Sequence, residues 1–230
     1  MTTVSRRHLL LAGAGLLLAP ALPAHAAKPS ARSALIVVDV QNCFVSGGTL
    51  AVKEGEQVVP VINRIAATFE NIVVTQDWHT PGHASFASSH AGKKPFETTK
   101  LRYGTQVLWP DHCVQGTPGA ALCKELDPAS ITRVFRKGSD PGVDSYSGFF
   151  DNGRRNATGL GDWLRAEGIT ALSVLGLATD YCVKFTALDA RDLGFDVTLL
   201  TQGCRGVELH AGDVARALDE LRSAGVHVRE

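Results

Sequence analysis

Short apolar runs recur along the chain, and they constrain its fold more than any other feature. The runs are rich in Val, Ile and Leu and lack the polar alternation of a half-exposed strand. Segments with apolar residues at helical spacing lie between some of them. Strands that alternate with helices predict a parallel sheet covered on both faces, in a single-domain, Rossmann-like three-layer α/β/α fold. The predicted strands are 34–38, 72–75, 131–135, 171–177 and 197–200, with an edge strand at 226–228, and the predicted helices are about 58–69, 160–167, 181–193 and 214–221.

The first 26 residues differ in kind from the rest of the chain. Arg6 and Arg7 precede an apolar run at 9–18, and a small-x-small cleavage pattern follows at 24–26. This order predicts a twin-arginine (Tat) signal peptide, which exports folded protein, here to a bacterial periplasm. A membrane anchor is the alternative, but the apolar run is short for a membrane span. The predicted organisation is a signal peptide at 1–26, a short linker at 27–33 and one domain at 34–230.

The charge balance bears on the partners that the chain can have. Lys and Arg together number 23, and Asp and Glu also number 23. A near-neutral domain offers no electrostatic footprint for nucleic acid or, after signal cleavage, for an anionic membrane. We therefore expect a small-molecule partner, and a homo-oligomer stays open.

The cysteines leave the redox state of the chain open. An exported protein can hold disulfides, but an odd number of cysteines and the absence of a CxxC pair predict at least one free thiol in a monomer. The five cysteines are Cys43, Cys113, Cys123, Cys182 and Cys204.

Four reactive side chains follow four of the predicted strands. Asp39 follows the first strand, Asp77 the second, Lys137 the third and Cys182 the fourth. The carboxyl ends of the strands form the ligand crevice in open parallel sheets, so these groups should converge there. A carboxylate that accepts a thiol proton, beside an ammonium that stabilises the resulting anion, suits attack on a carbonyl. Singly, each group also has an ordinary structural interpretation, such as a cap, a surface charge or packing.

Cys182 lies where segment 176–183 passes from a strand into the first turn of a predicted helix. The positive end of the helix dipole and the unpaired amides there favour a thiolate. A buried structural cysteine is the alternative interpretation of this segment alone.

A second cluster predicts a metal site. Asp77 and His79 are two residues apart, so in extended backbone they point the same way, and a loop can bring His112 to them. One carboxylate and two imidazoles suit a divalent transition ion such as Zn, Fe or Mn. The stretches 77–119 and 137–158 are long and irregular, and we expect them to be ordered loops that build the site.

Six segments together resemble the nicotinamidase/pyrazinamidase group of the isochorismatase-like cysteine hydrolases. The resemblance runs from residue 34 to the C-terminus. Its segments are VDVQN at 38–42 with Phe44 two residues on, TQDWH at 75–79, WPDHCV at 109–114, RKG at 136–138, DSYSGF at 144–149 and GLATDYCV at 176–183.

The resemblance implies an amidohydrolase that converts nicotinamide to nicotinate and ammonia through a thioester, in pyridine nucleotide (NAD) salvage, and that also accepts pyrazinamide. It implies a catalytic triad, a metal site, an oxyanion hole formed by two backbone amides after a cis peptide bond, and aromatic side chains around the ring. The residues concerned are Asp39, Lys137 and Cys182 (triad); Asp77, His79 and His112 (metal); His83 (beside the metal or an additional ligand); Ala178 and Cys182 (oxyanion hole); and Phe44, Trp109 and Tyr146 (substrate pocket).

Two other functions stay open at this point. A related amidase that acts on carbamoyl or other small amides would keep the triad, but such relatives generally lack the metal trio. An exported metal-binding or thiol redox protein would need no Lys137, and a redox role would require a resolving cysteine near Cys182, where the sequence has none adjacent.

Overall fold

A six-stranded sheet forms the centre of the molecule in the computed structural model, which describes Met1 and residues 32–230. The predicted signal peptide therefore lies outside the described residues. The strand order is β5-β2-β1-β6-β7-β8 and every neighbouring pair is parallel, which confirms the predicted α/β class. The strands of this sheet are β1 (Ser33–Val38), β2 (Asn71–Asp77), β5 (Arg133–Lys137), β6 (Ala171–Leu177), β7 (Asp196–Arg205) and β8 (His227–Arg229).

The strand order places a topological switch at the middle of the sheet. From β1 the chain continues through α1 (Val58–Ala66) to β2 on one side, and from β6 it continues through α3 (Lys184–Asp192) to β7 on the other. Right-handed crossovers in opposite directions place α1 and α3 on opposite faces of the sheet. The crevice of such a sheet opens where the neighbouring strands β1 and β6 end.

Burial explains why β1 is central. All six of its residues are buried, and the apolar side chains of β6 and β7 join the same core. Helix α1 packs against β6 and β7, α3 packs against both strands and against α4 (Asp213–Ser223), and α4 also contacts β8. The other helical segments are α2 (Leu160–Ala166), the π-helical turn η6 (Thr179–Val183) and short 3-10 turns at Asn42–Phe44, Gly55–Gln57, Ala87–Ser89, Pro118–Ala120 and Pro128–Ser130.

Several boundaries differ from the predicted ones because polar residues extend the apolar runs. β2 and β5 continue to Asp77 and Lys137, which pair with each other in register. β1 begins at Ser33, inside the predicted linker. The helix predicted at 181–193 is the π-helical turn η6 followed by α3.

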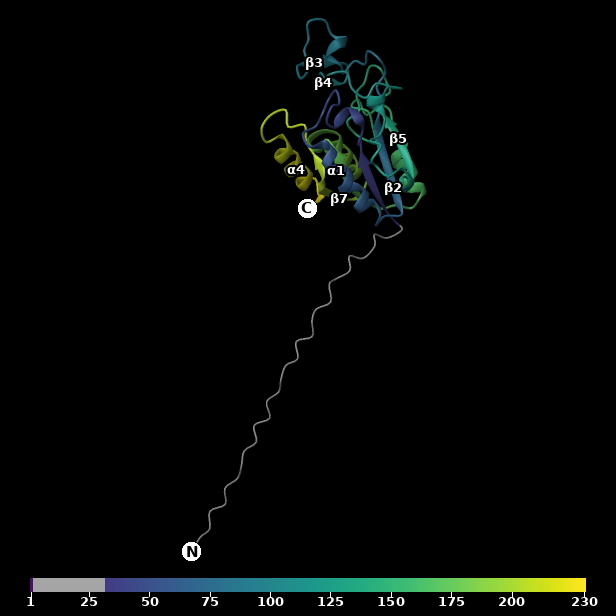
Figure 1. The fold of residues 1–230 in the computed structure, drawn as a ribbon, viewed down its shortest axis with the longest axis vertical. Helices are drawn as coiled ribbons and strands as arrows, with labels where there is room; N and C mark the ends of the chain where they lie inside the picture. The colour runs from purple at the N-terminus through teal and green to yellow at the C-terminus, as the bar shows by residue number, and fades with distance from the viewer. Residues whose placement is uncertain (2–31) are drawn as a thin grey trace.

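The stretch 77–119 contains a β-hairpin that the sequence did not predict. Strands β3 (Thr98–Leu101) and β4 (Gly104–Val107) pair antiparallel. Figure 1 shows this hairpin at the end of the molecule opposite the C-terminus. The strands are short, polar and mostly exposed, so no apolar alternation marked them.

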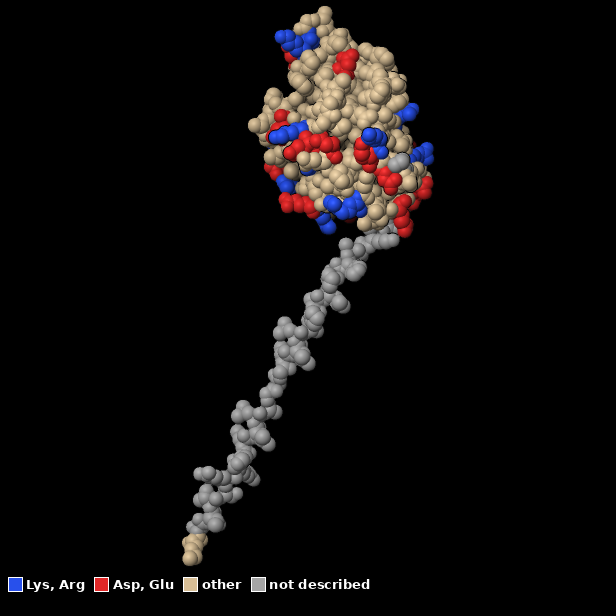
Figure 2. All heavy atoms as spheres, viewed as in Figure 1, with Lys and Arg blue, Asp and Glu red and all other residues tan. Residues whose placement is uncertain are grey.

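The surface carries both signs of charge. On the face in Figure 2, acidic and basic side chains are intermixed over the body of the domain. Within residues 32–230, no helix has the length and apolar character needed to cross a bilayer.

Candidate active site

Three reactive side chains from separate strands converge on one buried ammonium, that of Lys137. Its Nζ lies 2.9 Å from Asp39 Oδ2 and 3.5 Å from Cys182 Sγ. It also donates hydrogen bonds to Asp77 Oδ1 at 2.9 Å and to the carbonyl of Ser145 at 2.7 Å. The structure thus brings the residues of the predicted triad together at the carboxyl edge of the sheet.

Lys137 is the last residue of β5 and is only 2 % exposed. A buried ammonium is costly unless it is paired and hydrogen-bonded. Burial favours the neutral amine, but the carboxylates of Asp39 and Asp77 outweigh it and raise the pKa of Lys137 well above its ordinary value. The group is therefore a fixed positive charge at the centre of the site.

Asp39 follows β1 directly and is fully buried. Thr75 Oγ1 donates a hydrogen bond of 2.6 Å to Asp39 Oδ1, which fixes the carboxylate. Burial raises the pKa of Asp39 above its ordinary 3.8, although Lys137 acts in the opposite direction. A raised pKa suits a carboxylate that must accept and return a proton near neutral pH.

Cys182 lies in η6, directly after β6, and lines a cavity beside Asp77. The surroundings of Cys182 act against the thiolate that the helix end was predicted to favour. Burial raises the pKa of Cys182 well above its ordinary value; Lys137 opposes this shift, and Asp39 and Asp77 add to it. Desolvation and the two carboxylates thus outweigh the ammonium in their effect on the pKa of this thiol.

The backbone before Cys182 makes a close approach that requires glycine. Gly176 has φ +124°, and a Cβ there would lie 2.2 Å from the carbonyl oxygen of Val38. β6 can therefore lie tightly against β1 just before η6. The peptide bond between Leu177 and Ala178 is cis, and Ala178 lines the same cavity as Cys182.

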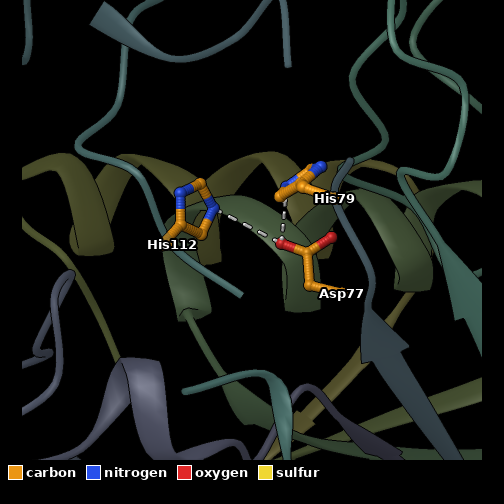
Figure 3. Close-up of side chains that lie close together, drawn as sticks. All are labelled: Asp77, His79 and His112. Carbon is orange, nitrogen blue, oxygen red and sulfur yellow. Dashed lines mark ion pairs between the residues drawn. The ribbon is translucent and has the colours of Figure 1, made fainter. Parts of the chain in front are cut away.

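A second group of buried side chains adjoins the triad through Asp77, the last residue of β2. Asp77 Oδ2 lies 3.2 Å from His79 Nε2 and 3.5 Å from His112 Nε2. Figure 3 shows both rings directed at this carboxylate. The donor atoms of the three residues all lie within 4.8 Å of one another, as a shared ion requires.

The hydrogen bonds of the two imidazoles fit this group to a divalent ion. His79 Nδ1 donates to the carbonyl of Gly138 at 3.0 Å, and His112 Nδ1 donates to that of Pro110 at 2.8 Å. Each ring thereby keeps Nε2 for a metal, which is the usual arrangement of ligating histidines. His79 Nε2 is buried and has no hydrogen-bond partner.

Glycine is also required beside His79. Gly138 has φ +68°, and a Cβ at this position would lie 2.6 Å from Cε1 of the His79 ring. Although burial opposes a charge on this ring, the carboxylate of Asp77 raises the pKa of His79 to about 8. An ion that binds there would replace this proton.

His83 lies beside the metal group. Its ring centroid is 4.4 Å from that of His79. Both of its ring nitrogens are engaged, Nδ1 with Ser85 Oγ at 2.8 Å and Nε2 with the carbonyl of Asp140 at 2.7 Å. Burial lowers the pKa of His83, and His79 lowers it further. This geometry favours a neighbour of the metal over an additional ligand.

Aromatic and apolar side chains wall the cavity in front of Cys182. Tyr146 and Tyr181 lie nearly perpendicular to Trp109, and the Trp109 indole donates a hydrogen bond to Tyr146 Oη. A flat ring fits between such surfaces. The lining residues are Phe44, Leu50, Asp77, Trp109, His112, Asp144, Tyr146, Ala178, Tyr181, Cys182 and Val207, so the predicted pocket residues all lie there.

Several residues that hold the site received no role from the sequence. The side chain of Gln41 bonds both the carbonyl and the amide of Asp77, at 2.9 and 2.7 Å. Thr75 holds Asp39, and the carbonyl of Ser145 holds Lys137. Gln41, Thr75 and Ser145 all belong to segments that carried the resemblance. Their positions close to Asp39, Asp77 and Asp144 in those segments were the only sequence signal that could have identified them.

A disulfide joins two loops of the site. Cys43, beside the pocket residue Phe44, is bonded to Cys113, which follows His112. Cys123, Cys182 and Cys204 are free and buried. The sequence left the pairing open because side-chain directions were unknown.

A comparison with protein-family models identifies the chain. The model described as the isochorismatase domain matches residues 33–230. The chain belongs to the isochorismatase family. Among curated proteins, the nicotinamidase of Escherichia coli strain K12 is 51% identical over 196 residues, which cover 84% of this chain and 92% of that protein.

Solved structures of isochorismatase-family enzymes agree with this assignment. A nicotinamidase/pyrazinamidase of Acinetobacter baumannii superposes with a TM-score of 0.86 at 44% identity, covering 88% of this chain and 98% of that one. A yeast nicotinamidase bound to the inhibitor nicotinaldehyde gives 0.81 at 32% identity, covering 86% and 99%. A Pyrococcus horikoshii pyrazinamidase in complex with zinc gives 0.71 at 35% identity, covering 86% and 99%.

Proposed function

We propose that this chain hydrolyses nicotinamide to nicotinate and ammonia, and pyrazinamide to pyrazinoate. The observation that carries the proposal is the contact of Lys137 with both Asp39 and Cys182, beside a metal-ligand trio that shares Asp77. The identity to nicotinamidases and the structural likeness to one bound to nicotinaldehyde support the same substrate class.

The reaction starts with attack by the sulfur of Cys182 on the carboxamide carbon. Asp39 takes the thiol proton as the carbon–sulfur bond forms, and the carbonyl electron pair moves to oxygen. The amides of Ala178 and Cys182 donate hydrogen bonds to this oxyanion. Lys137 stabilises the negative charge that passes between sulfur and carboxylate.

The intermediate collapses when Asp39 returns its proton to the amide nitrogen. The carbon–nitrogen bond breaks, ammonia leaves and the acyl group stays on Cys182 as a thioester. Asp39 then takes a proton from water, the hydroxide adds to the thioester carbon, and the acid leaves as the proton returns to the sulfur. One carboxylate thus serves both half-reactions.

Asp77, His79 and His112 would hold a zinc, iron or manganese ion, and the structure in complex with zinc supports a divalent ion in this family. When bound, the ion supplies a Lewis-acid contact for the ring nitrogen of the substrate. The chain's own residues do the rest of the positioning. Trp109, Tyr146 and Phe44 confine the ring so that the carboxamide meets Cys182.

We also propose that the protein is exported and that its nicotinate feeds pyridine nucleotide (NAD) salvage. The support for export is the twin-arginine pattern at Arg6 and Arg7, ahead of the apolar run at 9–18. Expression of the full chain in a bacterial host, followed by fractionation, tests it: activity in the periplasm and loss of export for Arg6→Lys/Arg7→Lys are the expected results. Activity confined to the cytoplasm contradicts export.

The deciding experiment is an ammonia-release assay over nicotinamide, pyrazinamide and a panel of carbamoyl compounds. We expect release from the two heteroaromatic amides and little from the carbamoyl compounds, which have no ring nitrogen to meet the metal group. Preference for a carbamoyl compound would replace the proposal with the related-amidase alternative.

A further inference from the structure

A third buried carboxylate, that of Asp144, adjoins the metal group and has no function in the reaction described above. Asp144 is 2 % exposed and lines the same cavity as Cys182. Its Oδ1 lies 3.8 Å from His79 Nε2. Within residues 32–230, no lysine or arginine forms an ion pair with it, whereas Asp39 and Asp77 both contact Lys137.

Two donors hold the Asp144 side chain in place. The amide of Ser145 donates to Oδ1 at 2.8 Å, and Gln106 Nε2 donates to Oδ2 at 2.8 Å. Both oxygens of the Asp144 carboxyl group are thereby fixed in position, with Oδ1 on the side of His79. Gln106 lies in β4, so the hairpin fixes the direction of this carboxylate.

The position of Asp144 suits a carboxylate that acts on the ion from beside the ligand trio. Ligands bonded at about 2.1 Å to one metal lie roughly 3 to 4 Å apart. His79 Nε2, which has no hydrogen-bond partner, lies 3.2 Å from Asp77 Oδ2 and 3.8 Å from Asp144 Oδ1. His79, His83 and Asp144 form a second group of donors within 4.8 Å of one another. This second group shares only His79 with the trio of Asp77, His79 and His112, so Asp144 lies beside the trio.

The buried charges of the site also favour a divalent cation near Asp144. Asp39, Asp77 and Asp144 bring three buried carboxylates to a site whose fixed cation is Lys137. Uncompensated buried charge is strongly unfavourable. A divalent cation beside His79 replaces the proton of that ring and adds positive charge close to Asp77 and Asp144.

We propose that Asp144 is an outer carboxylate of the metal site, next to His79, and that it raises the affinity of Asp77, His79 and His112 for a divalent ion. The inference rests on the metal site of the proposed function, but it concerns ion binding and not hydrolysis. Asp144 is thereby a positioning residue that acts on substrate through the ion.

Zinc binding by the metal-free enzyme tests the proposal. Competition with a chromophoric chelator gives the affinity of wild type, of Asp144→Asn and of a control, Asp151→Asn. Asp151 is also a buried carboxylate, but it accepts its hydrogen bonds from Arg155 and Asn156. We expect Asp144→Asn to bind zinc about 10- to 100-fold more weakly, the range seen when outer groups of metal sites are removed. Equal affinity of Asp144→Asn and wild type would overturn the proposal.

Thermal unfolding separates this function from a structural one. If Asp144 acts on the ion, Asp144→Asn relieves charge repulsion in the metal-free protein, and the rise in Tm on adding zinc becomes smaller than in wild type. If it only supports the fold, the metal-free Tm falls and the rise is unchanged. Asp144→Ser, which removes the charge with less bulk, provides the same readout should the asparagine variant fail to fold.

The two proposals fail in different ways. Wild-type protein that binds zinc but releases no ammonia from nicotinamide would contradict the proposed function and leave the inference standing. Ammonia release with an unchanged zinc affinity in Asp144→Asn would contradict the inference alone.

Discussion

The ammonium of Lys137 lies 3.5 Å from the sulfur of Cys182 while it contacts the carboxylate of Asp77. One cation therefore touches both the nucleophile and the metal group. A change on either side alters the field at the other, because charges this close interact strongly in a buried site. The site is best regarded as one electrostatic unit built at the ends of four strands, β1, β2, β5 and β6.

Replacing the nucleophile separates chemistry from folding. We expect Cys182→Ala to lower kcat for ammonia release by about 10⁴ or more, because no other group in the site can form the thioester. Circular dichroism and zinc content should match wild type. Cys123→Ala, which removes another buried free cysteine, is the matched control and should keep its activity. Substantial turnover by Cys182→Ala would reject the assignment.

Removing the central cation affects stability as well as rate. Lys137→Met leaves Asp39 and Asp77 buried without their partner, so we expect the metal-free protein to lose about 3–5 kcal/mol of unfolding free energy. Urea unfolding measures this loss. Lys184→Met, which breaks an ion pair with the exposed carboxylate of Glu220, should cost at most about 1 kcal/mol. Equal midpoints for the two variants would contradict the prediction.

The acid limb of the pH profile should report Asp39. The base acts only as a carboxylate, and burial raises the pKa of Asp39 above 3.8, so kcat/KM should fall as the pH drops through a value above 3.8. Thr75→Val removes the donor to Asp39 Oδ1, which stabilises the charged form, and should move this limb to higher pH. A profile that stays flat through pH 3.8 in protein that stays folded would exclude this base.

Metal removal should abolish most of the activity. Chelation leaves the triad intact but takes away the group that orients the ring, so kcat/KM for nicotinamide should fall by at least about 100-fold. Adding zinc, iron(II) or manganese(II) back singly should restore it and rank the ions. Full activity in protein shown by elemental analysis to be metal-free would remove the ion from the reaction.

The disulfide between Cys43 and Cys113 should stabilise the fold. It closes a loop with a sequence separation of 70, and a cross-link of this kind contributes about 2–4 kcal/mol. We expect reductant to lower the urea midpoint of wild type, and Cys43→Ser to unfold at the reduced midpoint with or without reductant. Identical unfolding of oxidised and reduced wild type would show that the bond has no stabilising effect.

The positions of the reactive residues could be predicted because they depend on strand ends. Apolar runs mark buried parallel strands, and parallel strands bring their carboxyl ends to one edge, so Asp39, Asp77, Lys137 and Cys182 converge as expected. Their chemical roles rest on the resemblance and stay predictions.

Other features depend on contacts that no local pattern encodes. The pKa of Cys182 moves upward because of burial and of carboxylates distant in sequence, which a helix-end argument leaves out. The β3–β4 hairpin is polar and exposed, and its Gln106 acts through one hydrogen bond to Asp144. The disulfide partner of Cys43 and the hydrogen-bond donors to Asp144 became evident only from the directions of the side chains in the structure.

The order of the strands has a consequence for unfinished chains. The base at Asp39 comes early, but the sulfur at Cys182 arrives only after β6, which must insert next to β1 before the two can meet. A chain truncated before residue 171 carries every ion ligand and no nucleophile. Turnover therefore reports that a chain has been made beyond Cys182 and has folded with β6 beside β1.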